Sequence, residues 1–471
     1  MNNEYLEIKE VVFQDIFKLS KNQLVIPEYQ RPYVWDIEKV EDLIKDFQEF
    51  FGIEKEAQDE LVDYYLGYIL LYDNVEKAHH EVVDGQQRLT TLLIIKHLLE
   101  ETIPSRESIS FNSQMSVNNI IKVRDFLKGR ISDIDFLHSK NFLDRLRFTV
   151  IITKKPDDAF TFFDTLNNRA VKLSATDFLK AYHLRSIKSV KVQDQVAQRW
   201  ETNNQDHLTQ LFYKVLWRAR NWKGNNNIEF ENKDAILRVF QKQTLKDKSL
   251  IDCSYPLYPN SKNRMAIRQK WNEESKVELT SMQVDFNKEI DYPFSLRQPI
   301  HDGLNFFHYT QKYVAIKELL FLSEPKGSAQ IIEMREFFDT VYTNDMSYYL
   351  KQFLELCLIL YYDNFGDECL LEAICKFDYV IGESRLTKKQ IQDKSVRLIL
   401  KENLNLLDVI AQAFLPQEIF DYVDSLTKVE EKYKSFAFDE KESSVRTRYY
   451  ERLNIYYGSK QDLKYRKSWK R

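Results

Sequence analysis

The chain has 471 residues, of which 43% are hydrophobic and 30% are charged, and its formal net charge is −4. This length and composition indicate a globular protein of two or three domains, and they exclude disordered and fibrous chains. The slightly negative balance excludes a globally basic nucleic-acid binder, so contact with nucleic acid must come from a local patch. No apolar run is long enough to span a bilayer, and the four cysteines form no C-x-x-C pair. We therefore expect a cytoplasmic protein with neither a zinc ribbon nor a disulfide framework.

Residues 1–185 combine short strands with helices. The sequence predicts a strand at Leu24–Ile26, which Pro27 breaks, and an amphipathic helix from Lys39. "DYYLGYILLYD" and "HHEVV" are typical of two paired strands, and "RLRFTVIIT" is typical of another. Further along, a helix is expected to begin at a cap formed by Ser174 or Thr176.

The stretch "EVVDGQQRLTTLLIIKHLLEE" places a polar cluster between a strand and a helix. Asp84 and Gly85 are turn residues, and the apolar spacing that begins at Leu89 indicates a helix. Gln86, Gln87 and Arg88 therefore lie at a helix N-terminus, where free backbone N–H groups and the helix dipole favour an anion. Arg88 adds a planar fork suited to phosphate. For these residues alone, ordinary helix capping with Arg88 on a solvated face is the alternative.

Two other clusters also place an arginine beside an amide side chain. "PEYQRPYVW" contains Tyr29, Gln30, Arg31, Tyr33 and Trp35, and "FDTLNNRAVKLSATDFLK" contains Asn167, Asn168, Arg169, Ser174 and Asp177. If the three clusters converge, Arg31, Arg88 and Arg169 face one anion. Asp84 or Asp177 is then available for a metal ion or a ribose hydroxyl. No P-loop motif occurs in the chain.

The three clusters resemble, in order and spacing, the signatures of a large prokaryotic domain family. It is the domain found in the GmrS half of GmrSD-type (type IV) restriction systems and in phosphorothioate-sensing phage-defence proteins. The resemblance covers about residues 8–185, and "FSLRQPIHDGLNFFHY" and "LYYDNFGD" look like the helical extension of such proteins. One departure is Ala170, which stands where the family usually has Gly. Because Ala resists positive φ, we expect a reshaped loop there and a weakened site.

The resemblance implies a ParB/sulfiredoxin-like fold that holds nucleotide phosphates and senses modified DNA. It implies hydrolysis of an NTP (GTP or ATP) with Mg²⁺. The implied catalytic residues are Asp84, Gln86 and Gln87, with Asp84 also a metal ligand. The implied nucleotide-binding residues are Gln30, Arg31, Gly85, Arg88, Asn167 and Arg169. Tyr29, Tyr33 and Trp35 form a cavity for a modified DNA group on this interpretation, or else belong to the core.

From residue 186 onward the pattern is almost wholly helical. "LFYKVLWRARNWKGNNN" places Lys214, Arg218 and Arg220 among tryptophans, and the tail "SKQDLKYRKSWKR" carries six basic residues against one Asp. Mixtures of basic and aromatic residues suit phosphate contact with base stacking, so we expect these three residues to bind DNA. The alternatives are a solvated helix face and a disordered tail.

No histidine follows His308, so the sequence lacks a complete C-terminal HNH nuclease module, which needs histidine as base and metal ligand. We predict an α+β protein with a ParB/sulfiredoxin-like domain at residues 1–185 and an all-α domain at 186–471. Its predicted role is a nucleotide-dependent sensor subunit that works on DNA with a separate HNH nuclease subunit. The alternatives are a DNA-binding or scaffolding module that binds nucleotide without turnover and, third, a stand-alone nuclease. The sequence names neither the nucleotide, the DNA modification nor the oligomeric state.

Overall fold

The computed structural model describes residues 6–155 and 174–469, with gaps at 20–23, 28–29, 31, 53–62, 76–78, 101–108, 110, 112–113, 140–141, 225–229, 246–267, 272–276, 281–287, 343–346, 389, 403 and 437–443. The chain divides into two compact units, Met1–Asn203 and Asn204–Arg471. The division comes later than residue 185 because α8 (Ala175–Arg185) and α9 (Val190–Glu201) pack against each other and cluster with the first unit.

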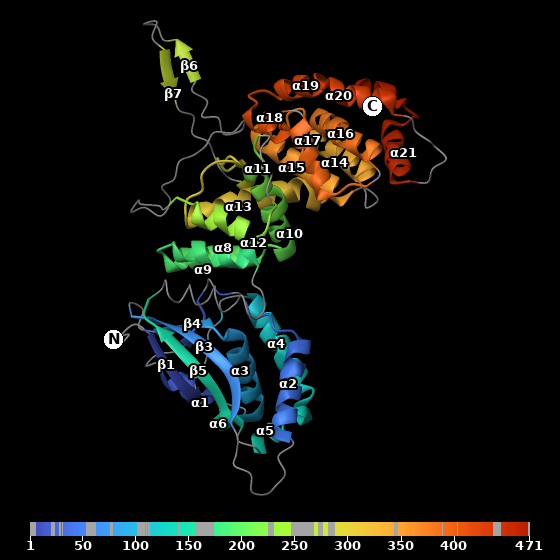
Figure 1. The fold of residues 1–471 in the computed structure, drawn as a ribbon. Coiled ribbons are helices and arrows are strands. Elements are labelled where there is room, and N and C mark those ends of the chain that lie inside the picture. Colours follow the sequence, from blue (N-terminus) through green and yellow to red (C-terminus); the bar gives the residue numbers. More distant parts are fainter. Residues whose placement is uncertain are drawn as a thin grey trace. The chain divides into compact units, whose positions relative to one another are not determined.

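A mixed five-stranded sheet forms the centre of the first unit (Figure 1). Its order is β1-β5-β3-β4-β2, with β1 antiparallel to β5, β5 parallel to β3, β3 antiparallel to β4 and β4 parallel to β2. The strands are β1 (Leu6–Val12), β2 (Leu24–Val25), β3 (Tyr64–Asn74), β4 (His79–Asp84) and β5 (Leu146–Thr153). The predicted pairing of "DYYLGYILLYD" with "HHEVV" is confirmed by the β3–β4 ladder.

Helices cover one face of this sheet, and Figure 1 shows α2, α3 and α4 beside it. In β5 the residues Leu146, Phe148, Val150 and Ile152 alternate toward the core, as a half-buried strand requires. The helices of the unit before α8 are α1 (Phe13–Leu19), α2 (Ile37–Gly52), α3 (Gln86–Glu100), α4 (Gln114–Lys128), η2 (Ile131–Asp133), α5 (Phe136–Ser139) and α6 (Phe142–Arg145).

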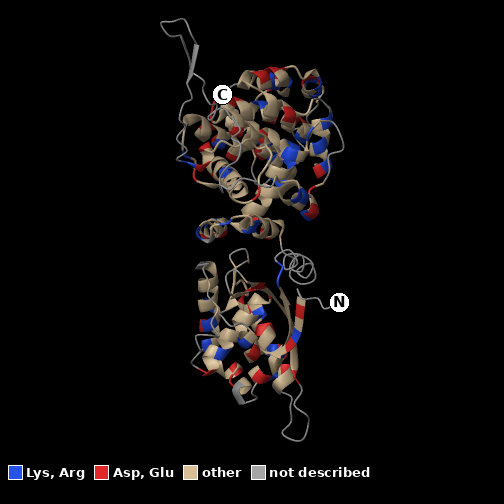
Figure 2. Cartoon of the chain, turned by 90° about the vertical axis from the view of Figure 1, so that its left-hand side faces the viewer, with Lys and Arg blue, Asp and Glu red and all other residues tan. Residues whose placement is uncertain are grey.

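Strand β1 forms one edge of the sheet, and alternating charges mark it (Figure 2). Its residues from Glu7 to Glu10 are exposed, and Lys9 pairs with Glu7 at 2.6 Å. Charged side chains on an edge strand oppose pairing with another chain, so this edge is protected against aggregation.

The second unit is built mainly of helices around the long buried pair α15 (Tyr348–Phe365) and α16 (Leu370–Thr387). Three of its segments, η3 (Leu211–Leu216), η4 (Arg238–Lys242) and η6 (Glu318–Leu322), are π-helical. The others are α10 (Gln205–Gln210), α11 (Trp217–Asn221), α12 (Lys233–Leu237), η5 (Glu289–Asp291), α13 (Leu304–Lys317), α14 (Ala329–Val341), α17 (Asp393–Glu402), α18 (Leu406–Gln412), α19 (Pro416–Asp424), α20 (Thr427–Ser435), α21 (Val445–Tyr457) and η7 (Leu463–Ser468).

The two units together confirm the predicted α+β fold with a large helical part. One detail differs, because β6 (Arg268–Trp271) and β7 (Val277–Thr280) pair as an antiparallel ladder in the region expected to be helical. Within the described ranges, every helix is too short or too polar to cross a bilayer.

Candidate functional site

The turn between β4 and α3 depends on Gly85, whose φ is +96°. A Cβ at this position would lie 2.9 Å from Ile69 Cγ1, so the strand-to-helix turn requires glycine. Helical hydrogen bonding begins where Leu89 N donates to Gly85 O at 3.0 Å. The N–H groups of Gln86, Gln87 and Arg88 come before that bond and have no acceptor among the described residues. This helix start therefore has the free donors that anion binding uses.

Gln86 carries a buried polar group without a partner among the described residues. Its side chain is only 4% exposed, and its Nε2 is buried without a hydrogen-bond partner. Thr90 lies one turn later on the same helix face, and its Oγ1 is also buried and unpartnered. An unsatisfied buried donor costs about 1–3 kcal/mol, and such groups in folded proteins commonly meet a ligand, an ion or water.

Gln87, although adjacent, is fully engaged. Its Oε1 accepts hydrogen bonds from Val34 N at 2.9 Å and Trp35 N at 3.1 Å, and its Nε2 donates to Pro32 O at 3.1 Å. Gln30 Nε2 in turn donates to Val83 O at the end of β4. The first and second sequence clusters are thus in contact, and Gln87 acts here as a positioning residue for the backbone of Pro32, Val34 and Trp35.

Arg88 points at the sheet. Its Nη1 donates to Leu66 O at 2.7 Å and its Nη2 donates to Tyr68 O at 2.8 Å. These carbonyls lie beyond Leu70, where the pairing of β3 with β4 begins, so the guanidinium extends the ladder past the end of β4. Gly67, with φ +98°, makes room for it, because a Cβ there would lie 2.4 Å from Nη1. Arg88 therefore has a structural role. Of the five N–H groups of its guanidinium, three have no acceptor in the described part of the chain.

Asp84 ends β4 and is the carboxylate closest to this helix start in the sequence. Its side chain is 23% exposed, and its Oδ2 lies 3.8 Å from Arg88 Nη2. Among the described residues no group of three or more His, Cys, Asp and Glu side chains could hold a metal. A single carboxylate fits Mg²⁺ only where phosphate oxygens and water complete the shell.

The third cluster is described only at its C-terminal end. Asn167, Asn168, Arg169 and Ala170 lie outside the described residues, as do Tyr29 and Arg31 of the first cluster. Ser174 caps α8, as predicted: its Oγ accepts from Asp177 N at 3.2 Å, and Asp177 Oδ2 accepts from Ser174 N at 2.9 Å. This reciprocal capping box occupies Asp177, so Asp177 is not the free metal or ribose ligand that the sequence suggested.

Lys180, which sequence reasoning missed, joins the third cluster to the first. Its side chain is 4% exposed, and its Nζ donates to Gln30 O at 3.3 Å and to Glu201 Oε1 at 2.5 Å. The signal was its position between the apolar residues Leu179 and Ala181, since a buried lysine must have partners. The three sequence clusters therefore converge, as far as they are described, through Gln87 and Lys180.

The predicted DNA contact of Tyr33 is wrong. The ring is 0% exposed, and its hydroxyl hydrogen-bonds Thr91 Oγ1 at 2.8 Å. Its backbone is held by Ser116 and Asn119 at 2.9 and 2.7 Å, and burial raises the pKa of Tyr33 to about 12. Trp35 is half-buried against the same core. These aromatic residues belong to the fold of the first unit, which was the alternative interpretation.

The predicted DNA contact of Arg218 is also wrong, whereas that of the partly exposed Arg220 stays a prediction. Arg218 is 0% exposed, and its Nη2 lies 2.5 Å from Glu231 Oε1 and 3.0 Å from Asp393 Oδ1. Burial alone would raise the pKa of Glu231, but the charge of Arg218 lowers it. Arg220 Nη1 donates to Leu296 O at 3.0 Å and to Gln298 O at 2.6 Å. Lys214 pairs with the same Glu231 at 2.6 Å, so Lys214 and Arg218 share this acid inside the second unit.

The two later stretches noted in the sequence meet each other in the second unit. Asp363 of "LYYDNFGD" accepts from Leu296 N of "FSLRQPIHDGLNFFHY" at 2.8 Å and from Tyr313 Oη at 3.1 Å. Lys312, 1% exposed, pairs with Asp363 at 2.7 Å. Their polar residues therefore stabilise the helical core.

Comparison with known families matches two models to this chain. Residues 13–184 match the GmrSD restriction endonuclease, N-terminal domain, and residues 192–440 match a family of unknown function (DUF7834). No curated protein matches the chain. The first match contains all three sequence clusters.

Proposed function

From its family membership we propose that the chain is the nucleotide-dependent sensor subunit of a restriction system directed at modified DNA. The chain belongs to the GmrSD-like type IV restriction family through its N-terminal domain and to the DUF7834 family through residues 192–440. The family membership makes it a component of a restriction system that acts on DNA. Nucleotide binding, turnover and the sensing of a modification are the proposed part.

The observation that supports nucleotide binding is the buried, unpartnered Nε2 of Gln86 beside the free N–H groups at the start of α3. A phosphate oxygen accepts hydrogen bonds and carries negative charge, so it would satisfy the donors and interact favourably with the helix dipole. No described group supplies an acceptor there. A bound nucleotide would therefore remove a cost that the free protein carries.

Each residue has a role in this proposal that its contacts allow. Gln86 and the N–H groups of α3 bind phosphate, and Arg88 contributes through the N–H groups that the β3 carbonyls leave free. Asp84 would hold Mg²⁺ together with phosphate oxygens, and the ion would supply charge stabilisation during phosphoryl transfer. Gln87 and Lys180 position the loop of the first cluster. Arg31, Asn167 and Arg169 remain proposed ligands.

The test compares Gln86→Ala with Gln48→Ala, an exposed glutamine on α2. The backbone N–H groups of α3 remain in this variant and hold the bound nucleotide, whereas the Gln86 amide contacts the phosphate most strongly during phosphoryl transfer. The loss of Gln86 should therefore lower the rate of phosphate release about tenfold or more while nucleotide affinity stays nearly intact. Gln48→Ala should change neither quantity. The measurements are calorimetric titration with ATP, GTP and CTP in Mg²⁺, and phosphate release in the presence of modified and unmodified phage DNA.

Two results would contradict the proposal. Binding of nucleotide without phosphate release under any of these conditions would favour the binding module without turnover. DNA cleavage by the pure protein that disappears in Asp84→Ala would favour the stand-alone nuclease and remove the need for a separate HNH subunit.

A further inference from the structure

We propose that the C-terminal segment Ser444–Trp469, together with Phe436, forms a contact surface for a single-stranded stretch of DNA. Strand phosphates would meet Lys460 and Lys464, and an unstacked base would enter the pocket between them. This inference rests on the DNA part of the proposed function and is independent of nucleotide turnover in the first unit.

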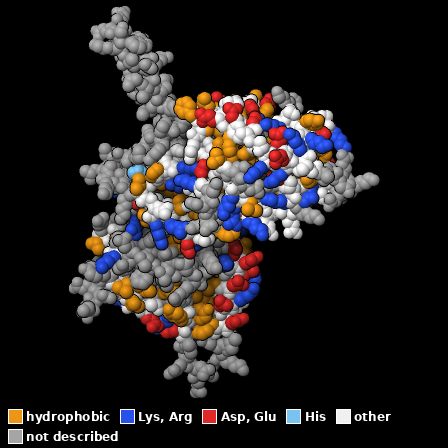
Figure 3. Space-filling model, turned by 45° about the horizontal axis from the view of Figure 1, so that its top comes forward, with side chains coloured by type: hydrophobic (Ala, Val, Ile, Leu, Met, Phe, Trp, Pro, Cys, Tyr) orange, Lys and Arg blue, Asp and Glu red, His pale blue; other side chains and the backbone are white. Residues whose placement is uncertain are grey.

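Positive charge is concentrated in this segment. Between Ser444 and Trp469 seven residues are basic and two are acidic, although the whole chain has a net charge of −4. Figure 3 shows Lys and Arg side chains over much of the visible face of the helical unit, including the end where Figure 1 draws α21. A local basic patch on an acidic protein supplies the electrostatic attraction that phosphate binding needs.

One arginine of the segment faces inward and anchors it. Arg466 is 3% exposed, and its Nη2 donates to Asp378 Oδ2 at 2.5 Å. Asp378 also accepts from the hydroxyls of Tyr342 and Tyr449, at 2.6 and 2.9 Å. The ring of Trp469 lies 4.7 Å from the Arg466 guanidinium. The segment up to Trp469 is therefore ordered, contrary to the disordered tail that the sequence allowed.

Because Arg466 is fixed, its neighbours are directed to the surface. Lys464 and Lys467 are exposed, and Tyr465 is 67% exposed, which is unusual for so large a ring. Lys467 lies 3.7 Å from Glu430, whereas Lys464 has no acidic partner in the part of the chain that the structure describes. The anchored backbone therefore presents an exposed cation and an exposed aromatic ring to a ligand.

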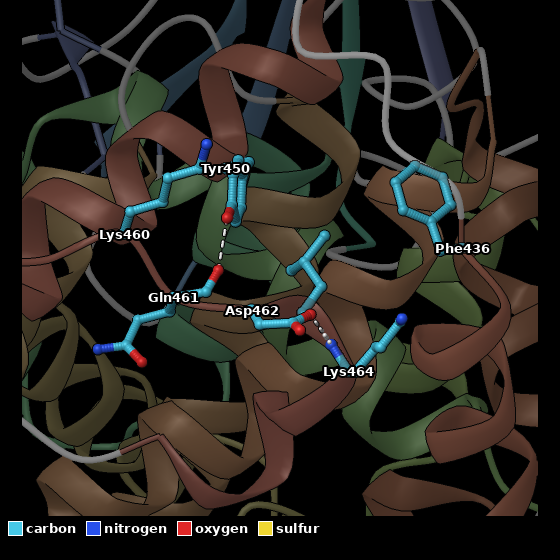
Figure 4. Close-up of a pocket in the computed structure, with 7 residues that line it drawn as sticks. Phe436, Tyr450, Lys460, Gln461, Asp462 and Lys464 are labelled. Carbon is cyan, nitrogen blue, oxygen red and sulfur yellow. Dashed lines mark hydrogen bonds between the residues drawn. The ribbon is translucent and has the colours of Figure 1, made fainter.

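A pocket of about 420 Å³ opens next to these side chains (Figure 4). It is lined by Phe436, Tyr450, Lys460, Gln461, Asp462, Leu463 and Lys464. In Figure 4 the Lys464 ammonium points toward the Phe436 ring, and the Tyr450 hydroxyl donates to Gln461 O. The acid in the lining, Asp462, accepts from Lys464 N at 2.9 Å and so caps η7.

The size and lining of this pocket favour an unpaired strand over a duplex. A volume of this order matches a small planar ligand such as one base, and a base inside a duplex cannot reach a concave site. Lysines beside aromatic rings are the combination that binds single strands, through phosphate contacts and base stacking.

The experiment measures binding of a fluorescein-labelled 20-nucleotide single strand to the full chain by fluorescence anisotropy. The Lys460→Ala/Lys464→Ala pair is compared with Lys326→Ala/Lys401→Ala, two exposed lysines elsewhere in the second unit that remove the same charge. We expect about tenfold weaker binding for the first pair only, with a salt slope shallower by about 1.4, since each lost phosphate contact removes about 0.7. Phe436→Leu should weaken binding about fivefold with an unchanged salt slope.

Equal affinities of the two lysine pairs would overturn this inference and leave the DNA part of the proposed function standing, provided that the wild-type chain binds DNA. Failure of the wild-type chain to bind any strand would overturn both. A preference for the duplex of the same sequence, unaffected by Phe436→Leu, would also overturn the pocket as a site for a base.

Discussion

The start of α3 and the stretch Leu211–Lys223 look similar in sequence, but their polar groups have different interaction partners in the structure. Both place arginine next to residues that suit phosphate contact. In the second unit Arg218 pairs with Glu231 and Asp393, and Arg220 donates to backbone carbonyls. These contacts stabilise helix packing. At α3 a buried amide and several N–H groups lack any described partner. Arg218 Nε and Nη1 are also buried without a partner, but two acids neutralise the guanidinium charge, whereas the N–H groups at the start of α3 have no acceptor among the described residues. Neutralisation by acids, and not basic composition, therefore distinguishes the structural network from the candidate ligand site.

The largest expected effect tests whether the ion pairs of Arg218 stabilise the second unit. Arg218→Ala removes a fully buried guanidinium from Glu231 and Asp393, which keep only Lys214 and Arg397 as partners, so we expect a loss of about 3 kcal/mol in the free energy of unfolding, the lower end for a broken buried ion pair. The partly exposed Lys214→Ala should cost about 1 kcal/mol or less. Urea denaturation of both variants gives the measurement. If Arg218→Ala unfolded like the wild-type chain but bound DNA more weakly, the interpretation of this stretch as a DNA-binding site would be supported instead.

Gly67→Ala tests the contact between Arg88 and β3. The substitution strains a backbone with φ +98° and places a Cβ 2.4 Å from Arg88 Nη1, so we expect about 2–4 kcal/mol of destabilisation. Gly224→Ala is the matched control, because φ is +60° there and nothing lies within 4 Å, and it should cost about 1 kcal/mol. Thermal unfolding of the two variants compares them. Equal losses in the free energy of unfolding for Gly67→Ala and Gly224→Ala would mean that the Arg88 side chain moves away from β3 at no cost.

The adjacent residues Gln86 and Gln87 allow the same comparison, between a side chain without partners among the described residues and one that is fully hydrogen-bonded, inside one motif. Gln87→Ala leaves the N–H groups of Val34 and Trp35 without their acceptor, so we expect a loss of about 1–3 kcal/mol. Gln86→Ala relieves the cost of a buried donor without a partner but also removes buried methylene groups, and because these effects oppose each other, the free energy of unfolding should change by about 0.5 kcal/mol or less without nucleotide. Denaturation with and without ATP or GTP separates binding from stability. A large loss in Gln86→Ala without nucleotide would show an internal role.

The smallest expected effect concerns pH. Burial of His80 lowers its pKa from the usual 6.5, although Asp73, 3.5 Å away, opposes the shift. The folded state therefore binds fewer protons than the unfolded state, and this contribution is present above about pH 6.5 and is lost as the pH falls below it. His80→Gln should show a smaller drop in melting temperature between pH 7.5 and 5.5 than the wild-type chain. An equal drop would assign the pH dependence to other groups.

The sequence predicted what local patterning encodes. Alternating apolar residues identified β3, β4 and β5, and Ser174 with Asp177 identified the start of α8. Strand β1 was missed because its exposed edge position leaves "IKE" without a buried alternation. The β6–β7 pair was missed because neither short strand stands out in a helical context.

Site contacts were harder to predict because they depend on partners far away in the sequence. The motif correctly placed Arg88 at a helix start, but its acceptors lie on β3, about twenty residues earlier. Tyr33 and Arg218 carry groups suited to DNA contact, yet their burial is decided by Thr91 and Glu231. Composition shows which side chains can bind a ligand, and only the fold shows which of them are already satisfied.

The ion pair between Lys180 and Glu201 crosses the limit between the two family matches. Lys180 lies inside the match at residues 13–184, whereas Glu201 lies inside the match at 192–440, and both belong to the first compact unit. An evolutionary exchange of the C-terminal part would therefore leave a buried ammonium without its carboxylate, at a cost of several kcal/mol. In this chain, a different continuation would have to supply a new acid to Lys180, or Lys180 would have to be replaced. The two matched regions of this chain therefore depend on each other through one buried ion pair.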